Sequence, residues 1–285
     1  MTSISTTILK GDTHLMTSQQ NGRTYRIQVN LPLGYDKSPG DGWPFNNAPA
    51  QWPIIYVLDG NWYTGLVTDM IGPMAWCGST NDAIVVGIGY PEGHDAVDSF
   101  WISFTRRDHD LTPTPDEAAQ KAMETQHQRP APNGDAGGFL KFIQHELIPM
   151  IERDYRADPA QRILLGHSYG GLFALYALFE APDLFQTVIA GSPTLAYGSR
   201  FTFQQEATFA ENHKRLPANL CLYVGEHEES LDDTTTTDTL RMAAILQSRH
   251  YDGFTLTQRM FLGENHCEVA APGFQWGLKQ ALKRA

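Results

Sequence analysis

Hydrophobic residues along the chain fall into short runs bounded by glycine, proline and other turn-forming residues. The first run, 24–29, alternates between polar and apolar side chains and therefore predicts an exposed antiparallel strand at the edge of a sheet. The runs in the middle of the chain are hydrophobic almost throughout, which is typical of strands covered on both faces. The six runs that we interpret as further strands are 53–58, 83–88, 162–165, 187–190, 220–224 and 255–261.

Longer segments with a helical pattern alternate with these strands. The expected helices span 138–156, 169–180, 237–250 and 273–283. This alternation predicts an α/β fold with a mostly parallel sheet and helices on both of its faces. A length of 285 residues and a hydrophobic fraction of 41% suffice for one large core, so we expect a single domain over 1–285.

One long connection, at about 91–135, interrupts the alternation. Prolines flank a short helical stretch within it, and the segment is much longer than an ordinary loop. Loops of this length are usually functional or disordered. Because the segment follows a strand that ends near Ile88, it should emerge at the carboxyl edge of the sheet, where α/β sheets bind ligands. We therefore expect it to form a wall or a lid over the functional site.

The formal net charge of −11 argues against partners that carry many phosphates, so we expect neither nucleic acid nor an anionic membrane surface. Residues 1–10 lack a basic region followed by an apolar one, and no apolar stretch is long enough to span a bilayer. We expect a cytoplasmic protein. Its three cysteines, Cys77, Cys221 and Cys267, match no zinc or disulfide spacing, which predicts free thiols and no metal site.

The strongest chemical signal is Arg-Ile-Leu-Leu-Gly-His-Ser-Tyr-Gly-Gly at 162–171. It places Ser168 between a buried strand and a buried helix, which is the setting of a strained turn that exposes a nucleophilic hydroxyl. Side chains at Gly166 and Gly170 are expected to collide with the crossing backbone, so glycine is needed at both positions. The alternative is an ordinary glycine and serine turn. We predict that Ser168 is a nucleophile.

A serine nucleophile needs a general base, and histidine is suited to it near neutral pH. His266 follows the last predicted strand and precedes the last helix, in Leu-Gly-Glu-Asn-His at 262–266. That position lies on a carboxyl-edge loop and gives the chain order serine, acid, histidine that this architecture uses. We assign His266 as the base; the alternative is a capping or surface histidine.

The acidic partner of the histidine should follow the penultimate strand, where Gly225 opens a loop with three glutamates. We choose Glu228 because the chain must turn off the strand before a side chain can point back, and Glu226 is its rival. The alternative is a solvated acidic turn. His227 in the same loop predicts no metal site, because the spacing His-Glu-x-x-His is absent.

The reaction also needs two backbone amides that stabilise the developing oxyanion. We assign Tyr169, at the start of the helix after the nucleophile, and Asn61, just past Gly60 in the turn after the first central strand. Asp59 in the same turn is expected to stabilise the turn rather than to act as a free carboxylate. The aromatic run at 100–104 is expected to form core or pocket wall.

With these residues placed, the chain resembles the esterase D-like branch of the α/β-hydrolases, which contains siderophore esterases, small-molecule carboxylesterases and mycolyltransferases. The greatest similarity is to intracellular esterases of the trilactone and fusarinine siderophores. The resemblance implies the α/β-hydrolase fold, with an antiparallel N-terminal edge. The segments that carry it are 56–60, 107–113, 138–143, 146–149, 166–171, 225–228 and 263–266.

The resemblance also bears on substrate binding. Arg106 and Arg107 match a basic position of the family, which implies either a structural ion pair or a contact to an acidic group of the substrate. We favour the structural role slightly, and we keep both arginines together with Trp62 as candidate substrate-binding residues.

These observations lead to one principal hypothesis, a cofactor-independent serine hydrolase that cleaves carboxylic esters through an acyl-enzyme. A small-molecule ester, in the first place a ferric siderophore, is the expected substrate. One alternative is an acyltransferase, or a macrolactone-forming or polyketide esterase, with the same three residues. The other is a non-catalytic binding protein with this fold, against which the presence of Ser168, Glu228 and His266 argues.

Overall fold

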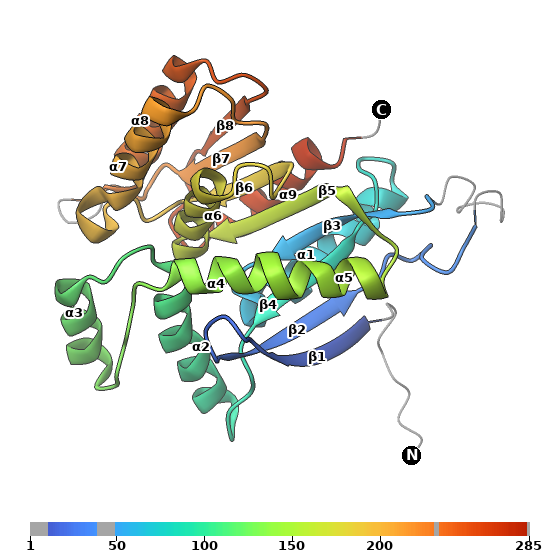
Figure 1. The fold of residues 1–285 in the computed structure, drawn as a ribbon, viewed down its shortest axis with the longest axis horizontal. Helices are drawn as coiled ribbons and strands as arrows, with labels where there is room; N and C mark the ends of the chain where they lie inside the picture. The colour runs from blue at the N-terminus through green and yellow to red at the C-terminus, as the bar shows by residue number, and fades with distance from the viewer. Residues whose placement is uncertain (1–10, 39–48, 231–233, 284–285) are drawn as a thin grey trace.

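The structure is a computed structural model that describes residues 11–38, 49–230 and 234–283. Residues 1–10, on which part of the localisation expectation depends, lie outside this range. Within the described residues, eight strands form one sheet in the order β1-β2-β4-β3-β5-β6-β7-β8 (Figure 1). The strands are Gly11–Thr17 (β1), Thr24–Asn30 (β2), Trp52–Val57 (β3), Ile84–Gly89 (β4), Ala157–His167 (β5), Thr187–Gly191 (β6), Asn219–Gly225 (β7) and Thr255–Phe261 (β8).

Helices surround this sheet. They are Gly60–Trp76 (α1), Ala96–Leu111 (α2), Glu117–His127 (α3), Ala136–Phe142 (α4), a π-helical turn at Ile143–Leu147 (η1), Ile148–Asp154 (α5), Tyr169–Glu180 (α6), Tyr197–Asn212 (α7), Thr235–Arg249 (α8) and Ala270–Ala281 (α9). None of the helices in the described part of the chain combines the length and the apolar character needed to cross a bilayer.

The strand directions confirm the expected fold class. β3 to β8 run parallel to one another, and β1 and β2 add the antiparallel edge. The edge position predicted for 24–29 is wrong, because β2 is paired on both sides and β1 is the outermost strand. β1 gave no hydrophobic signal because all of its residues are exposed or half-buried.

Alternate side chains of the central strands enter two separate cores. Ile54 and Tyr56 of β3 pack toward α4, α5 and α6, whereas Ile55 and Val57 pack toward α1 and α9. Figure 1 shows α4 and α5 crossing one face of the sheet, with α1 and α9 on the other. Burial on both faces explains the nearly continuous hydrophobicity of these strands. Because all the parallel strands point the same way, their following loops gather at one edge.

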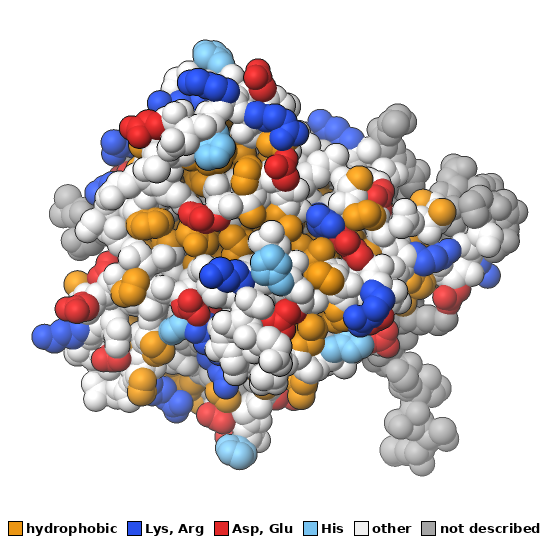
Figure 2. Space-filling view, viewed as in Figure 1, with side chains coloured by type: hydrophobic (Ala, Val, Ile, Leu, Met, Phe, Trp, Pro, Cys, Tyr) orange, Lys and Arg blue, Asp and Glu red, His pale blue; other side chains and the backbone are white. Residues whose placement is uncertain are grey.

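The 91–135 segment contains two helices, α2 and α3. Figure 1 shows both on the side of the molecule toward which β3 and β5 point. The segment therefore lies on the side of the carboxyl edge, and α2 packs against α4 and α6. On the face drawn in Figure 2, acidic and basic side chains are interspersed rather than gathered by sign.

Candidate active site

The loops at the carboxyl edge bring together residues that are far apart in the chain. Ser168 follows β5, Ser192 follows β6, Glu228 follows β7 and His266 follows β8. Asp59, at the end of β3, completes the set on the other side of β5. Parallel strands impose this convergence, since each strand delivers its next residue to the same edge.

Ser168 occupies a strained turn. Its backbone angles, φ 60 and ψ −121, are rarely adopted by a residue with a side chain and cost about 1–3 kcal/mol. Two backbone hydrogen bonds hold the turn: the Ser168 amide donates to Gly191 O at 2.9 Å, and the Leu172 amide donates to Ser168 O at 2.9 Å. The serine is half-buried, so the turn leaves part of this residue accessible to solvent.

The glycines around Ser168 have different roles. A Cβ at Gly166 would lie 2.3 Å from Gly170 O, so the predicted collision with the crossing backbone occurs there. At Gly170 the prediction is wrong, because the nearest atom to a Cβ would be a side-chain oxygen, Asp59 Oδ2, at 3.3 Å. The second close backbone approach is at Gly171, where a Cβ would lie 2.4 Å from Gly191 O.

Replacing Gly166 by alanine is expected to destabilise the fold by about 3 kcal/mol, since the added methyl group must displace backbone rather than a flexible side chain. The free energy of unfolding in urea measures this. Gly65→Ala is the matched control: it lies in α1 with no atom within 4 Å of the added methyl, and it should stabilise the protein by about 0.5–1 kcal/mol. Equal effects of the two substitutions would contradict the packing described for the turn.

Glu228 is the residue that contacts the histidine. His266 Nδ1 lies 2.5 Å from Glu228 Oε2, and the glutamate side chain is fully buried. The other oxygen, Oε1, accepts from Ser192 Oγ at 2.7 Å and from the Gly225 amide at 2.5 Å. Burial alone would raise the pKa of Glu228, but the hydrogen bonds it accepts outweigh burial and lower that pKa. The carboxylate is therefore held charged next to the imidazole.

Glu226, the rival acid, takes another position. Its Oε2 accepts a hydrogen bond from the Gly263 amide at 2.9 Å, and its own amide donates to Phe261 O at 2.9 Å. It joins the two loops that follow β7 and β8. The Glu226 carboxylate is thus used in holding the loop that carries His266.

His167, next to the nucleophile in sequence, ties His266 to the turn. Its Nε2 donates to the His266 carbonyl oxygen at 2.8 Å, and the two imidazole rings lie 4.8 Å apart. His167 is 2% exposed, and burial, with a further contribution from His266, lowers its pKa to about 3. The His266 side chain is 37% exposed and remains accessible beside the strained turn.

The buried His167 predicts a pH dependence of stability. Its pKa is about 3 in the folded protein and about 6.5 when unfolded, so the unfolded chain takes up the proton first as the pH falls. Above about pH 6.5 protonation of His167 does not reduce the free energy of unfolding. Below that pH it reduces the free energy of unfolding by about 1.4 kcal/mol per pH unit. Between about pH 7 and about pH 5 the parent should lose about 2 kcal/mol more unfolding free energy than His167→Asn. Parallel pH curves would show that His167 is not the group involved.

Both predicted oxyanion donors lie at helix starts, where backbone amides have no partner within the helix. Tyr169 is the first residue of α6, and Asn61 is the second of α1. The Asn61 side chain is used elsewhere: its Nδ2 donates to Tyr90 O at 3.0 Å, and its Oδ1 accepts from the Tyr90 amide at 2.6 Å. This fixes the turn after β3 to the end of β4. Only the backbone amide of Asn61 is left to serve as the donor.

The three candidate substrate-binding residues have different surroundings. Arg107 is buried and forms a two-point ion pair with Asp59, with Nε to Oδ1 at 2.8 Å and Nη2 to Oδ2 at 3.0 Å. Arg106 points toward Thr24, whose carbonyl oxygen lies 3.4 Å from Nη1. Trp62 is 36% exposed, and its ring lies 6.0 Å from that of Phe100. Trp62 is the most exposed of the three residues, and its side chain is aromatic.

Ser192 was not predicted. It is fully buried, has φ 40, and donates to the Glu228 carboxylate at 2.7 Å, so it orients the acid. Tyr223 was also missed; its ring fills the space over Gly191 and Gly273, where any added Cβ would collide with it. A signal for Ser192 existed in the Gly-Ser-Pro turn that directly follows the strand at 187–190.

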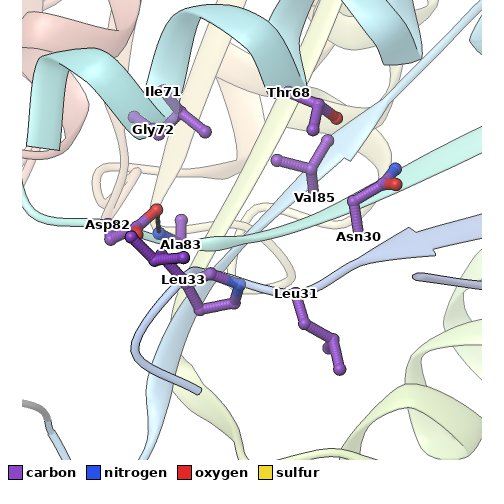
Figure 3. Close-up of a pocket in the computed structure, with 10 residues that line it drawn as sticks. Asn30, Leu31, Leu33, Thr68, Ile71, Gly72, Asp82, Ala83 and Val85 are labelled. Atoms are coloured by element: carbon purple, nitrogen blue, oxygen red, sulfur yellow. Dashed lines mark hydrogen bonds between the residues drawn. The ribbon is translucent and has the colours of Figure 1, made fainter. Parts of the chain in front are cut away.

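A small pocket lies away from this site (Figure 3). Asp82 and Ala83, which precede β4, line it together with Thr68 and Ile71 of α1. Burial raises the pKa of Asp82 to about 6, and its Oδ1 accepts a hydrogen bond from the Ala83 amide at 2.9 Å. The start of a parallel strand lies at the edge opposite its end, so this pocket is separate from Ser168.

Comparison with known proteins identifies the family. The model of the Esterase family matches residues 18–266. The chain belongs to the Esterase family. This esterase is 33% identical over 277 residues to the ferri-bacillibactin esterase BesA of Bacillus subtilis, across 94% of this chain and 88% of the relative. It is 34% identical over 196 residues to the siderophore triacetylfusarinine C esterase of Aspergillus fumigatus, across 68% of this chain and 59% of the relative.

A solved structure extends the similarity to the whole fold. The BES protein from Bacillus cereus superposes with a TM-score of 0.78 at 26% identity, and the match covers 100% of both chains. The esterase therefore has the α/β-hydrolase fold and is a carboxylic ester hydrolase, as expected from the resemblance.

Proposed function

We propose that this esterase is a serine hydrolase in which Ser168, His266 and Glu228 form the catalytic triad. The observation that carries the proposal is the hydrogen bond from His266 Nδ1 to the buried Glu228 carboxylate, beside a serine on a strained strand-to-helix turn. With Nδ1 donating to the acid, Nε2 is left unprotonated and can accept the serine proton. The charged glutamate also stabilises the imidazolium that forms.

The reaction proceeds in two halves. Ser168 Oγ attacks the ester carbonyl carbon while His266 takes its proton, and the carbonyl oxygen becomes an oxyanion held by the Tyr169 and Asn61 amides. The intermediate collapses when His266 returns the proton to the departing alcohol, which leaves an acyl-serine. A water molecule, deprotonated by His266, then attacks the acyl carbon, and Ser168 regains its proton as the acid departs.

The substrate we propose is a siderophore ester, loaded with iron as cargo. Two relatives of this chain are named as esterases of bacillibactin and of triacetylfusarinine C. The aromatic surface of Trp62 and Phe100 beside the site suits a bulky, partly planar substrate, because such rings bind flat groups by stacking.

We also propose a cytoplasmic location, since the exposed thiols of Cys77 and Cys267 suit a reducing compartment. Cell fractionation tests this location.

Steady-state kinetics on ferric siderophore esters and on 4-nitrophenyl acetate test the substrate class. We expect kcat/KM to be higher for at least one ferric siderophore than for the acetate. Trp62→Ala should lower kcat/KM about tenfold for that siderophore, because a stacking contact is lost, and should leave the acetate nearly unchanged. Turnover of simple esters alone, with no siderophore cleaved, would overturn the siderophore assignment, and acyl transfer to an added alcohol with little free acid would favour a transferase.

A further inference from the structure

Asp59 stands at the start of α1 but does not cap it. Its backbone is left-handed, with φ 52 and ψ 44, and its side chain makes no capping hydrogen bond. An aspartate at this position ordinarily accepts a hydrogen bond from the amide of the second or third helical residue. Here those residues are Asn61 and Trp62, and the Trp62 amide already donates to the Asp59 carbonyl oxygen at 2.9 Å. The Asn61 amide is therefore the remaining capping donor for the Asp59 side chain, and the carboxylate does not accept a hydrogen bond from it.

Arg107 holds that carboxylate away. Both oxygens of the Asp59 carboxylate accept hydrogen bonds from the guanidinium, at 2.8 and 3.0 Å, and Arg107 is only 7% exposed. The guanidinium also lies over the Trp62 ring, with Cζ 5.3 Å from the ring centroid, and over the Tyr169 ring at 5.2 Å. Arg107 of α2 therefore contacts the segments that carry both proposed oxyanion donors.

The position of the carboxylate makes its charge important. Asp59 Oδ2 would lie 3.3 Å from a Cβ at Gly170, so it sits directly beside the nucleophile turn. An unpaired negative charge there would repel the oxyanion that forms on the substrate, because such charges interact strongly where water is excluded. A nearby positive partner removes this penalty.

We propose that Arg107 is a positioning residue of the oxyanion hole: it keeps the Asp59 carboxylate off the Asn61 amide and neutralises its charge. The inference rests on the proposed function. It explains why the guanidinium is buried and paired at two points rather than left open to an acidic group of the substrate. It also assigns to the 91–135 segment a task in catalysis, through α2, that does not require the segment to move.

Two substitutions, made singly and then together, test this role. Arg107→Gln should lower kcat on 4-nitrophenyl acetate about a hundredfold with little change in KM, the effect of losing one oxyanion donor. Adding Asp59→Gly removes the competing carboxylate and suits the left-handed backbone. The double variant should then recover about tenfold in kcat. If the pair served only to stabilise the fold, the double variant would be no faster than Arg107→Gln, and that result would overturn the proposal.

Arg249→Gln is the matched control. Arg249 forms the same two-point pair with the buried Glu206, at 2.9 and 2.8 Å, between α8 and α7. It should lower the unfolding free energy without changing kcat of the folded enzyme. If Arg107→Gln fails to fold, Arg107→Lys, which keeps the charge but not the fork, is compared with and without Asp59→Gly. The expected recovery is then smaller than about tenfold, because lysine still neutralises the carboxylate and only the restraint on its position is lost; no recovery at all would overturn the proposal.

Labelling of the parent by a fluorophosphonate separates the two proposals. A parent that neither reacts with the probe nor turns over an ester would overturn the serine mechanism together with the role of Arg107. A parent that reacts, combined with a double variant no faster than the single one, would overturn the role of Arg107 alone.

Discussion

Replacing Ser168 by alanine is expected to lower kcat for any ester substrate on the order of 10⁶-fold, while the protein keeps its fold. Without the hydroxyl no acyl-enzyme can form, and the remaining oxyanion donors can assist only direct attack by water. The backbone strain at φ 60 remains in the variant, because alanine must adopt the same backbone angles. Initial rates with purified protein, normalised to folded enzyme, measure the effect.

Ser248→Ala serves as the control for that substitution. Ser248 is an exposed serine of α8 whose hydroxyl donates to Ile245 O at 2.7 Å. Its removal should leave kcat unchanged. A Ser168→Ala protein that kept a substantial part of the parental rate would mean that another group, or water activated elsewhere, performs the attack.

Replacing Glu228 by glutamine is expected to lower kcat about 10⁴-fold. Ser192 and Gly225 both donate to Oε1, so the amide oxygen should stay on that side and the amide NH₂ should face His266. The NH₂ group would then donate to Nδ1, which places the imidazole proton on Nε2. In that tautomer His266 cannot accept the proton of Ser168.

Glu226→Gln is the matched control, because Glu226 lies two residues earlier and accepts only from the loop amide of Gly263 among the contacts described for its side chain. It should change kcat by less than about fivefold, since a neutral amide oxygen can accept the same hydrogen bond. Steady-state kinetics of both variants decide the matter. A large loss with Glu226→Gln and a small one with Glu228→Gln would reverse the assignment of the acid.

Local signals in the sequence predicted the parts of the fold that are buried and regular. The helix after the nucleophile spans Tyr169–Glu180, as predicted, because an apolar run bounded by turn residues defines it. The last strand also spans Thr255–Phe261 as predicted, although its residues are exposed or half-buried. The order of strands along the chain also placed the serine, acid and histidine loops at one edge. That argument needs only parallel strands, and the structure has them.

Elements without a hydrophobic period could not be predicted. β1 is nearly all exposed, and α1 contains Gly65, Gly72 and Pro73, which obscure its helical pattern. Contacts between distant segments were also out of reach: neither the pairing of Arg107 with Asp59 nor that of Ser192 with Glu228 leaves a periodic trace. Such contacts depend on how the sheet brings loops together, which a single sequence does not record.

Mass spectrometry of the protein after reaction with a fluorophosphonate tests the central claim most directly, because the probe forms a stable covalent bond only with an activated nucleophile. One adduct per chain is expected, on the peptide that contains Ser168, with formation abolished in Ser168→Ala and greatly slowed in His266→Ala. An unmodified parent, or an adduct located on another residue, would contradict the account.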